Sequence, residues 1–243
     1  MGILGQTGTR SAPTLVNRGY GRSFFWDGRA ATLEEQVLQP IANPIELGLP
    51  IEQAVGRLSG ADDYRRAFDA AFGREVNATD LSRALASYVR SIVSGNAPFD
   101  RYLHGDRTAL SEQAQRGLAV FRGKGNCTVC HVGPLLSDEE CHNTGVAWKD
   151  GVLHDLGRFT VTRKDADRGA FKTPTLREIA RTAPYMDDGS IATLEAVIEF
   201  YDRGGTPNPF HDPEVRPLGL TREERDALRA LLESLTGEAT DIK

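Results

Sequence analysis

The sequence predicts an all-α protein. Helical patterns recur along the chain between loops that hold many of its 25 glycines and 12 prolines. The alternation of apolar and polar residues that is typical of strands is hard to find. A length of 243 residues suits one large domain or two small ones, each big enough to bury a core.

Four helices are predicted in the first hundred residues. The first covers residues 32–38 and begins at Thr32, with Glu35 three positions later as in a capping box. The rest of residues 5–50 is predicted to be mostly loop. Further helices are predicted over residues 51–58, 62–72 and 79–93. The last of them carries apolar side chains at three- and four-residue steps, which predicts a face packed on a core: Leu81, Leu85, Tyr88, Val89 and Ile92.

The helical pattern breaks around residues 105–108, where we place a boundary between domains 1–107 and 108–243. A new helix over residues 111–121 then leads to Cys127. The closing helix begins with Thr221 and Glu224 as a capping box, and Gly237 ends it. One side of this helix is apolar, with leucines at 228, 231, 232 and 235.

Composition narrows the classes of partner. A net charge of -5 argues against nucleic acid and anionic membranes, which both select for basic surfaces. No apolar run approaches the ~20 residues of a membrane span. The first residues lack the basic and apolar regions of a secretory signal. Three cysteines leave no room for a disulfide framework.

A haem-attachment motif, C-x-x-C-H, occupies residues 127–131. The thiols of Cys127 and Cys130 can add to the two vinyl groups of one haem while His131 ligates the iron. A zinc site would need further ligands, for which His142 beside Cys141 is the candidate, and redox chemistry of the thioredoxin kind would need a βαβ setting. The motif therefore predicts one covalent haem c, with zinc or redox chemistry as the rival.

The order of elements around this motif is typical of a small cytochrome c domain: a helix leading into it, a long loop-rich middle and a closing amphipathic helix. Two residues compete for the second axial position. Met186 is the only internal methionine, and thioethers commonly partner histidine. Tyr201 shares the inward apolar face of a helix predicted over residues 193–201. Residue spacing leaves both open.

Six segments taken together resemble the bacterial di-haem cytochrome c peroxidases, and within them the MauG-like group. They are RSAPTLVN (10–17), FFWDGRAATLEEQ (24–36), NPIELG (43–48), GNCTVCH (125–131), FKTPTLREIARTAPYMDDGS (171–190) and LEAVIEFYDRGG (194–205). Members have two cytochrome c domains, each with a haem. The first haem motif lies upstream of the block at 10–17, and this sequence has no such motif. Residues 1–107 are thus similar to an incomplete peroxidatic domain, through truncation, a misplaced start or genuine loss.

The resemblance assigns roles to individual residues. Trp26 matches the electron relay between the two haems. Gln36, Pro40 and Glu46 match positions around the peroxide-binding face of the first haem, where the Glu46 carboxylate would act as general acid-base. The sixth ligand of the second haem is methionine in ordinary members and tyrosine in the MauG-like group, which implies Tyr201, with Met186 as the alternative.

The family also holds a calcium ion between its domains. Thr182 and Pro184 match the carbonyl donors, and Ser11 occupies the position of an asparagine ligand, a loss that weakens the site. Lys172 and Arg177 are predicted partners of the haem propionates. Asp187 replaces a histidine found in many relatives and has no explanation.

The implied function is electron transfer from a small redox protein or another donor through the haem and Trp26 to a peroxide-activating haem. The reaction would be reduction of hydrogen peroxide or a peroxide-dependent oxidation, in the periplasm. The alternatives are a monohaem electron-transfer protein without peroxidase activity and an inactive fragment. No nucleic acid and no membrane span are expected.

Overall fold

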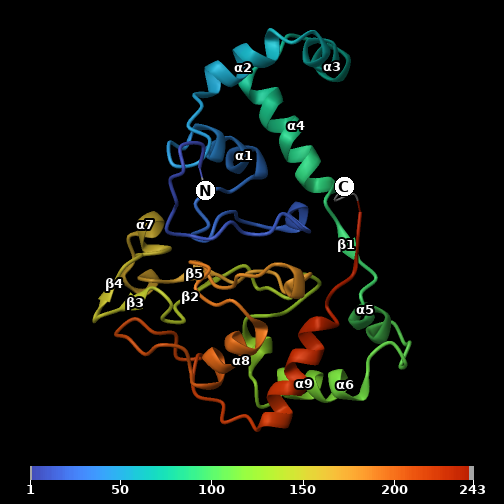
Figure 1. Ribbon diagram of the computed structural model, residues 1–243, viewed down its shortest axis with the longest axis vertical. Coiled ribbons are helices and arrows are strands. Elements are labelled where there is room, and N and C mark those ends of the chain that lie inside the picture. Colours follow the sequence, from blue (N-terminus) through green and yellow to red (C-terminus); the bar gives the residue numbers. More distant parts are fainter. Residues whose placement is uncertain (1, 241–243) are drawn as a thin grey trace.

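The computed structural model describes residues 2–240, which form two regions stacked one above the other (Figure 1). The amino-terminal region, residues 2–95, lies above the carboxy-terminal region, residues 97–240. The α-helices of the described residues are α1 (Leu33–Ala42), α2 (Ile51–Ser59), α3 (Asp62–Phe72), α4 (Ala78–Ser91), α5 (Pro98–Leu103), α6 (Glu112–Arg122), α7 (Phe159–Thr162), α8 (Leu194–Asp202) and α9 (Arg222–Glu233).

The predicted all-α class is wrong, because short strands occur among these helices. They form three antiparallel pairs: β1 (Ser94–Gly95) with β6 (Glu238–Ala239), β2 (Cys141–His142) with β5 (Phe171–Lys172), and β3 (Trp148–Lys149) with β4 (Val152–Leu153). Each strand has only two residues, too few to show an alternating pattern in the sequence. Each pair links two loops by backbone hydrogen bonds, and the pairs do not combine into a larger sheet.

Several helix positions agree closely with the sequence. Helix α3 has the predicted limits, although no side chain caps its first turn. Helices α6 and α9 begin after Ser111 and Thr221, whose side chains accept hydrogen bonds from the first turns. Helix α1 is longer than predicted, because it continues through Pro40, which removes one backbone N–H without ending the helix. The short helix α5 was not predicted from the sequence.

The carboxy-terminal region has one large core. Helices α6 and α9 cross and pack against each other, and α8 packs against α9 (Figure 1). Gly117 makes this close approach possible, since a Cβ there would lie 2.0 Å from the Ala227 carbonyl oxygen. Phe99 of α5 belongs to the same core. Among its most buried side chains are Ala114, Leu110, Ile198, Leu231 and Leu235.

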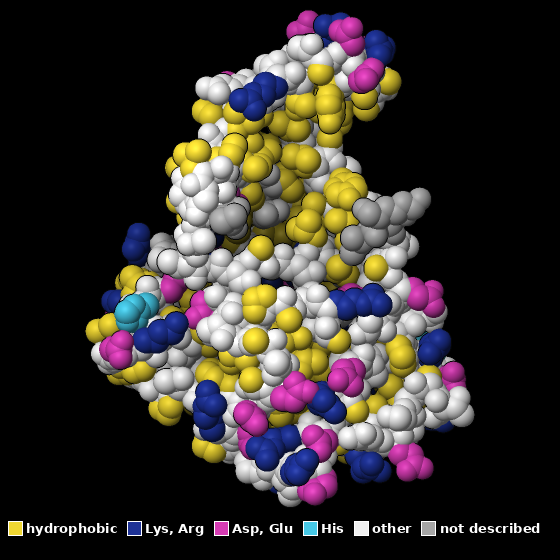
Figure 2. Space-filling view, in the orientation of Figure 1, with side chains coloured by type: hydrophobic (Ala, Val, Ile, Leu, Met, Phe, Trp, Pro, Cys, Tyr) yellow, Lys and Arg dark blue, Asp and Glu magenta, His cyan; other side chains and the backbone are white. Residues whose placement is uncertain are grey.

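The amino-terminal region has two smaller cores. In one, Leu33 of α1 packs with Ala86 and Val89 of α4 and with Phe24. In the other, Ala54 and Phe68, from α2 and α3, meet Leu81 of α4. Among the large apolar side chains exposed in this region are Leu15, Tyr20, Ile45, Leu47, Tyr64 and Tyr88. Figure 2 shows hydrophobic side chains gathered over the visible face of the region.

A buried ion network joins the two regions. The Glu139 carboxylate accepts hydrogen bonds from Arg18 Nη1 at 2.9 Å and from Lys172 Nζ at 3.4 Å. Burial alone would raise the pKa of Glu139, but the hydrogen bond from Arg18 and the charge of Lys172 lower it to about 2. The β1–β6 pair makes a second link (Figure 1).

None of the helices in residues 2–240 is long and apolar enough to cross a bilayer.

Candidate haem site

The haem motif lies just beyond the end of α6. A 3-10 turn, Cys127–Val129, follows Asn126 in the left-handed conformation, and the His131 amide donates a hydrogen bond to the Cys127 carbonyl at 2.9 Å. Gly125 precedes it at a point where a Cβ would lie 2.8 Å from the Val120 carbonyl oxygen, so only glycine fits. This turn directs both thiols and the imidazole into one cavity.

The imidazole of His131 is prepared to ligate a metal. Its Nδ1 lies 2.7 Å from the Leu136 carbonyl oxygen, which can only accept, so the ring proton belongs on Nδ1 and Nε2 keeps its lone pair. Burial lowers the pKa of His131. The ring therefore stays neutral, and the lone pair of Nε2 is available to a metal.

The cavity lies between the two regions and is mainly apolar. From the carboxy-terminal core it is lined by Phe121, Leu176, Leu194, Ile198, Leu228 and Leu232, and from the amino-terminal region by Phe24, Phe25, Trp26, Leu33 and Gln36. An apolar cavity with two thiols and a neutral imidazole at its wall fits a haem c, which needs covalent anchors, an iron ligand and a dry surrounding.

Tyr201 and Met186, the two candidates for the second axial position, both line this cavity. Tyr201 is on α8, where Leu194 and Ile198 of the same face are buried. Its hydroxyl makes no hydrogen bond within residues 2–240. Burial, together with the neighbouring groups of Cys130 and Cys127, raises its pKa. Met186 lies in a turn and has a positive φ of 72°.

Trp26 is tied to the loop that carries Met186. Its indole Nε1 donates a hydrogen bond to the Ser11 carbonyl at 2.8 Å, and the Ser11 amide donates one to the Asp187 carbonyl at 2.7 Å. The Asp187 side chain is buried, and burial together with the charge of Asp188 raises its pKa to about 7. Thr182 and Pro184 line the same cavity.

The residues matched to a peroxide-binding face are spread out. Gln36 of α1 lines the cavity. Pro40 lies one turn further along α1. Glu46 follows in the next turn, where its carboxylate accepts a hydrogen bond from Asn43 Nδ2 at 2.8 Å. Within the described part of the chain, neither Pro40 nor Glu46 contributes to the cavity wall.

The two predicted propionate partners differ in position. Lys172 lines the cavity, is buried and is held by Glu139. Arg177 donates hydrogen bonds to Asp100 Oδ1 at 2.6 Å and to the Pro134 carbonyl at 2.8 Å. Arg177 is therefore not among the described residues that line the cavity.

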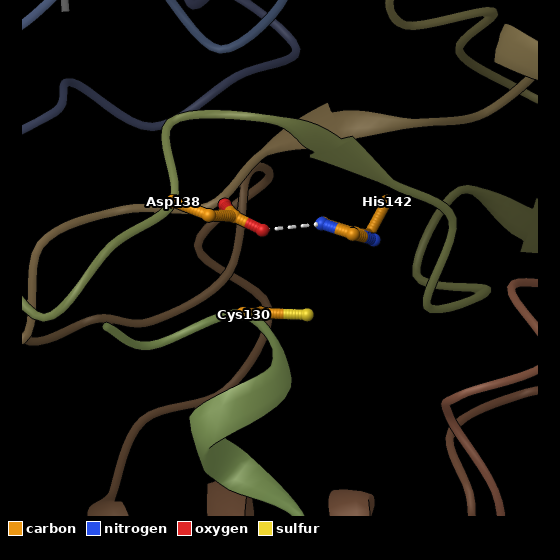
Figure 3. A group of neighbouring side chains, drawn as sticks. All are labelled: Cys130, Asp138 and His142. Carbon is orange, nitrogen blue, oxygen red and sulfur yellow. Dashed lines mark hydrogen bonds and ion pairs between the residues drawn. The ribbon is translucent and has the colours of Figure 1, made fainter. Parts of the chain in front are cut away.

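His142 was named from the sequence as a candidate metal ligand, but the group to which it belongs was missed. The Asp138 carboxylate and the His142 ring face each other, with the Cys130 sulfur close to both (Figure 3). The ring of His142 lies between two carboxylates, with Nδ1 2.6 Å from Asp212 Oδ2 and Nε2 3.0 Å from Asp138 Oδ2. The spacing of Asp138 and His142 was a weak signal, whereas Asp212 is seventy positions away and could not have been found.

Paired thiols, a neutral imidazole held through Nδ1 and an apolar cavity under packed helices define the class of a c-type cytochrome. The comparisons with known proteins agree. A sequence model of the di-haem cytochrome c peroxidase family matches residues 1–108. The methylamine utilization protein MauG of Methylorubrum extorquens is 40% identical over 235 residues, covering 96% of this chain and 66% of that protein.

Other relatives give the same result. Cytochrome-c peroxidase IdrP2 of Denitromonas iodatirespirans is 35% identical over 260 residues, covering 96% of this chain and 70% of that protein. The crystal structure of a MauG-like protein associated with microbial copper homeostasis has a TM-score of 0.89 and 33% identity, covering 98% of this chain and 78% of that one. The chain belongs to the di-haem cytochrome c peroxidase and MauG family, and it spans about two thirds of the length of these curated relatives.

Proposed function

We propose that this chain carries one covalent haem c and passes electrons through it toward a peroxide-activating haem. The observation that carries the proposal is the C-x-x-C-H turn, which brings Cys127, Cys130 and His131 to an apolar cavity with Nε2 of His131 unprotonated. A haem bound there would supply one-electron redox chemistry at its iron. The reaction served would be reduction of hydrogen peroxide or a peroxide-dependent oxidation.

The protein groups in the proposal have distinct tasks. Cys127 and Cys130 would hold the porphyrin through thioether bonds, and His131 would bind the iron through Nε2. The Leu136 carbonyl keeps the ring proton on Nδ1 and fixes the ring orientation. Lys172 supplies positive charge at the cavity wall.

Tyr201 is the proposed second axial ligand. Tyr201 belongs to helix α8 and lines the cavity, and its hydroxyl makes no hydrogen bond within residues 2–240. Met186, by contrast, lies in a turn. A phenolate oxygen stabilises ferric iron relative to ferrous iron, while a thioether does the reverse. Tyrosine ligation would therefore make this haem a low-potential electron store.

Trp26 is the proposed electron relay. It lines the cavity, and its indole is held by the Ser11 carbonyl at 2.8 Å, so the ring has a fixed position at the junction of the two regions. A small redox protein in the periplasm is the proposed electron donor. A peroxidatic centre around Gln36, Pro40 and Glu46 would require a second haem.

A calcium ion is proposed between the two regions. The carbonyls of Thr182 and Pro184 accept no hydrogen bond within residues 2–240, and both residues line the cavity beside Ser11. Free carbonyl oxygens are donors that calcium favours.

The alternative is a monohaem carrier without peroxidase activity. It is favoured by the completeness of the carboxy-terminal region, which holds one large core together with the haem motif and both candidate axial ligands. Haem stoichiometry of the protein isolated from its native host, by pyridine haemochrome assay, separates the two functions: two haems support the peroxidase and one supports the carrier.

Substitution of Tyr201 tests the proposed ligand. In the haem-loaded protein, Tyr201→Phe should open the axial site, shift the ferric spectrum toward high spin and raise the reduction potential. Met186→Leu is the matched control and should change both little. A sulfur-to-iron charge-transfer band in the ferric spectrum, lost in Met186→Leu and kept in Tyr201→Phe, would assign the ligand to methionine.

A further inference from the structure

Three metal-binding side chains converge beside the haem motif. The Cys130 sulfur, a carboxylate oxygen of Asp138 and a ring nitrogen of His142 all lie within 4.8 Å of one another. They come from the end of the 3-10 turn, from the following loop and from β2, and Figure 3 shows the Cys130 sulfur beside the facing side chains of Asp138 and His142. All three side chains are half-buried, so a small ion can reach them.

The donor set is one that zinc favours. Thiolate, imidazole and carboxylate are the three kinds of protein ligand found at Zn²⁺ sites. Three protein ligands with a fourth position taken by water form a common tetrahedral zinc site.

An outer carboxylate already fixes the imidazole. Asp212 Oδ2 lies 2.6 Å from Nδ1 of His142, which directs Nε2 toward Asp138 and the Cys130 sulfur. Metal-bound histidines characteristically donate their second N–H to a carboxylate in this way. Asp212 is held in turn by its place in the loop, where its Oδ1 accepts the Glu214 amide at 2.9 Å.

Protons occupy the positions that a metal would take. Both ring nitrogens of His142 face carboxylate oxygens, and only an imidazolium has an N–H for each. Binding Zn²⁺ would release the Nε2 proton and the Cys130 thiol proton, giving a thiolate and a neutral imidazole as ligands.

We propose that the haem-free chain binds one Zn²⁺ through Cys130, Asp138 and His142, and that zinc binding and haem attachment exclude each other. Both need the same sulfur. Attachment adds the Cys130 S–H across a haem vinyl group: a C–S bond forms, the hydrogen goes to the other vinyl carbon, and no electrons are gained or lost. The resulting thioether cannot become a thiolate, so a zinc ion must leave before this bond forms.

Cobalt provides a spectroscopic probe for the site. The full-length chain, produced without haem and kept reduced, should bind one Co²⁺ with a thiolate-to-cobalt absorption band in the near ultraviolet, and Zn²⁺ should abolish the band. Cys130→Ala should lose the band. His142→Ala should weaken zinc binding at least tenfold, and Asp212→Asn should weaken it tenfold to a hundredfold, as expected for an outer carboxylate.

Matched controls separate this site from other thiol sites. Cys127→Ala, Cys141→Ser and His154→Ala should bind cobalt like the parent, and all variants should keep the parent's helical circular dichroism. The haem-loaded protein should bind no zinc at this position. An equal loss in Cys127→Ala and Cys130→Ala would mean that the two motif thiols bind the metal together and would overturn the proposal. Absence of cobalt binding by the haem-free parent would overturn it as well.

Discussion

The two regions of the molecule are organised differently. The carboxy-terminal region has one core of fifteen buried residues built around α6, α8 and α9, whereas the amino-terminal region divides its apolar residues between cores of five and four. The amino-terminal region also leaves Tyr64 and Tyr88 more than half exposed. Burial of apolar area is the main source of stability, so the carboxy-terminal region should be the more stable.

This difference separates the tasks of the regions in the candidate site. The thiols, the imidazole and both candidate axial ligands come from the carboxy-terminal region, which can hold them rigidly. The amino-terminal region supplies Trp26 and an apolar wall. We therefore expect the wall to open locally without displacing the candidate iron ligands.

Loss of the haem should produce the largest difference in stability between the two regions. With Cys127→Ala and Cys130→Ala together, we expect no covalent haem instead of one per chain, and a lower melting temperature of the carboxy-terminal region because its cavity loses its contents. Pyridine haemochrome assay and intact mass measure the haem. Cys141→Ala is the control and should keep it; covalent haem in the double variant would contradict the assignment.

Disruption of the ion network between the regions should have the second-largest effect on stability. Glu139→Gln leaves Arg18 and Lys172 buried without their carboxylate, which should cost ~3 kcal/mol of unfolding free energy. The folded-state pKa of Glu139 is lowered from 4.5 to about 2, so its contribution is present above pH 4.5 and is lost as the pH falls toward 2. Between these pH values, the unfolding free energy measured in urea should therefore fall more for the parent than for the variant.

The neighbouring acid provides the control for that measurement. Glu140 is largely exposed, and its distance to Arg22 is 3.8 Å, so Glu140→Gln should leave the unfolding free energy nearly unchanged. An equal loss in both variants would show that the network does not join the regions.

Core truncations should separate the two regions. Leu231→Ala removes a nearly fully buried side chain from the large core and should cost ~3 kcal/mol, whereas Leu81→Ala in a smaller core should cost ~2 kcal/mol. Hydrogen exchange should report faster opening of α6, α8 and α9 in the first variant and of α2, α3 and α4 in the second. Faster exchange throughout both regions in either variant would mean that they unfold as one unit.

The smallest expected effect concerns the surface of the amino-terminal region. Arg90 of α4 forms an ion pair with Glu34 of α1, with 2.7 Å between Nη1 and Oε1. The hydrogen bond from Arg90 lowers the pKa of Glu34. A double-mutant cycle with Glu34→Gln and Arg90→Gln should give a coupling of ~0.5 kcal/mol, because solvent screens this pair. A coupling several times larger would show that the two helices depend on it.

Much of the local structure could be predicted from the sequence because its causes are local. The side chains of Thr32, Ser111 and Thr221 accept hydrogen bonds from amides three residues later, and all three positions were identified from the residue pattern. The haem motif is equally local, since five consecutive residues contain both thiols and the imidazole.

Tertiary structure decided the features that join distant segments. The two-residue strands pair residues that have no pattern of their own, such as Ser94 with Ala239. Glu139 lies 121 positions from Arg18, and His142 lies 70 from Asp212. Such pairs depend on how helices and loops pack, because a side chain contacts whatever the fold brings to it, and the sequence around each partner does not record the other.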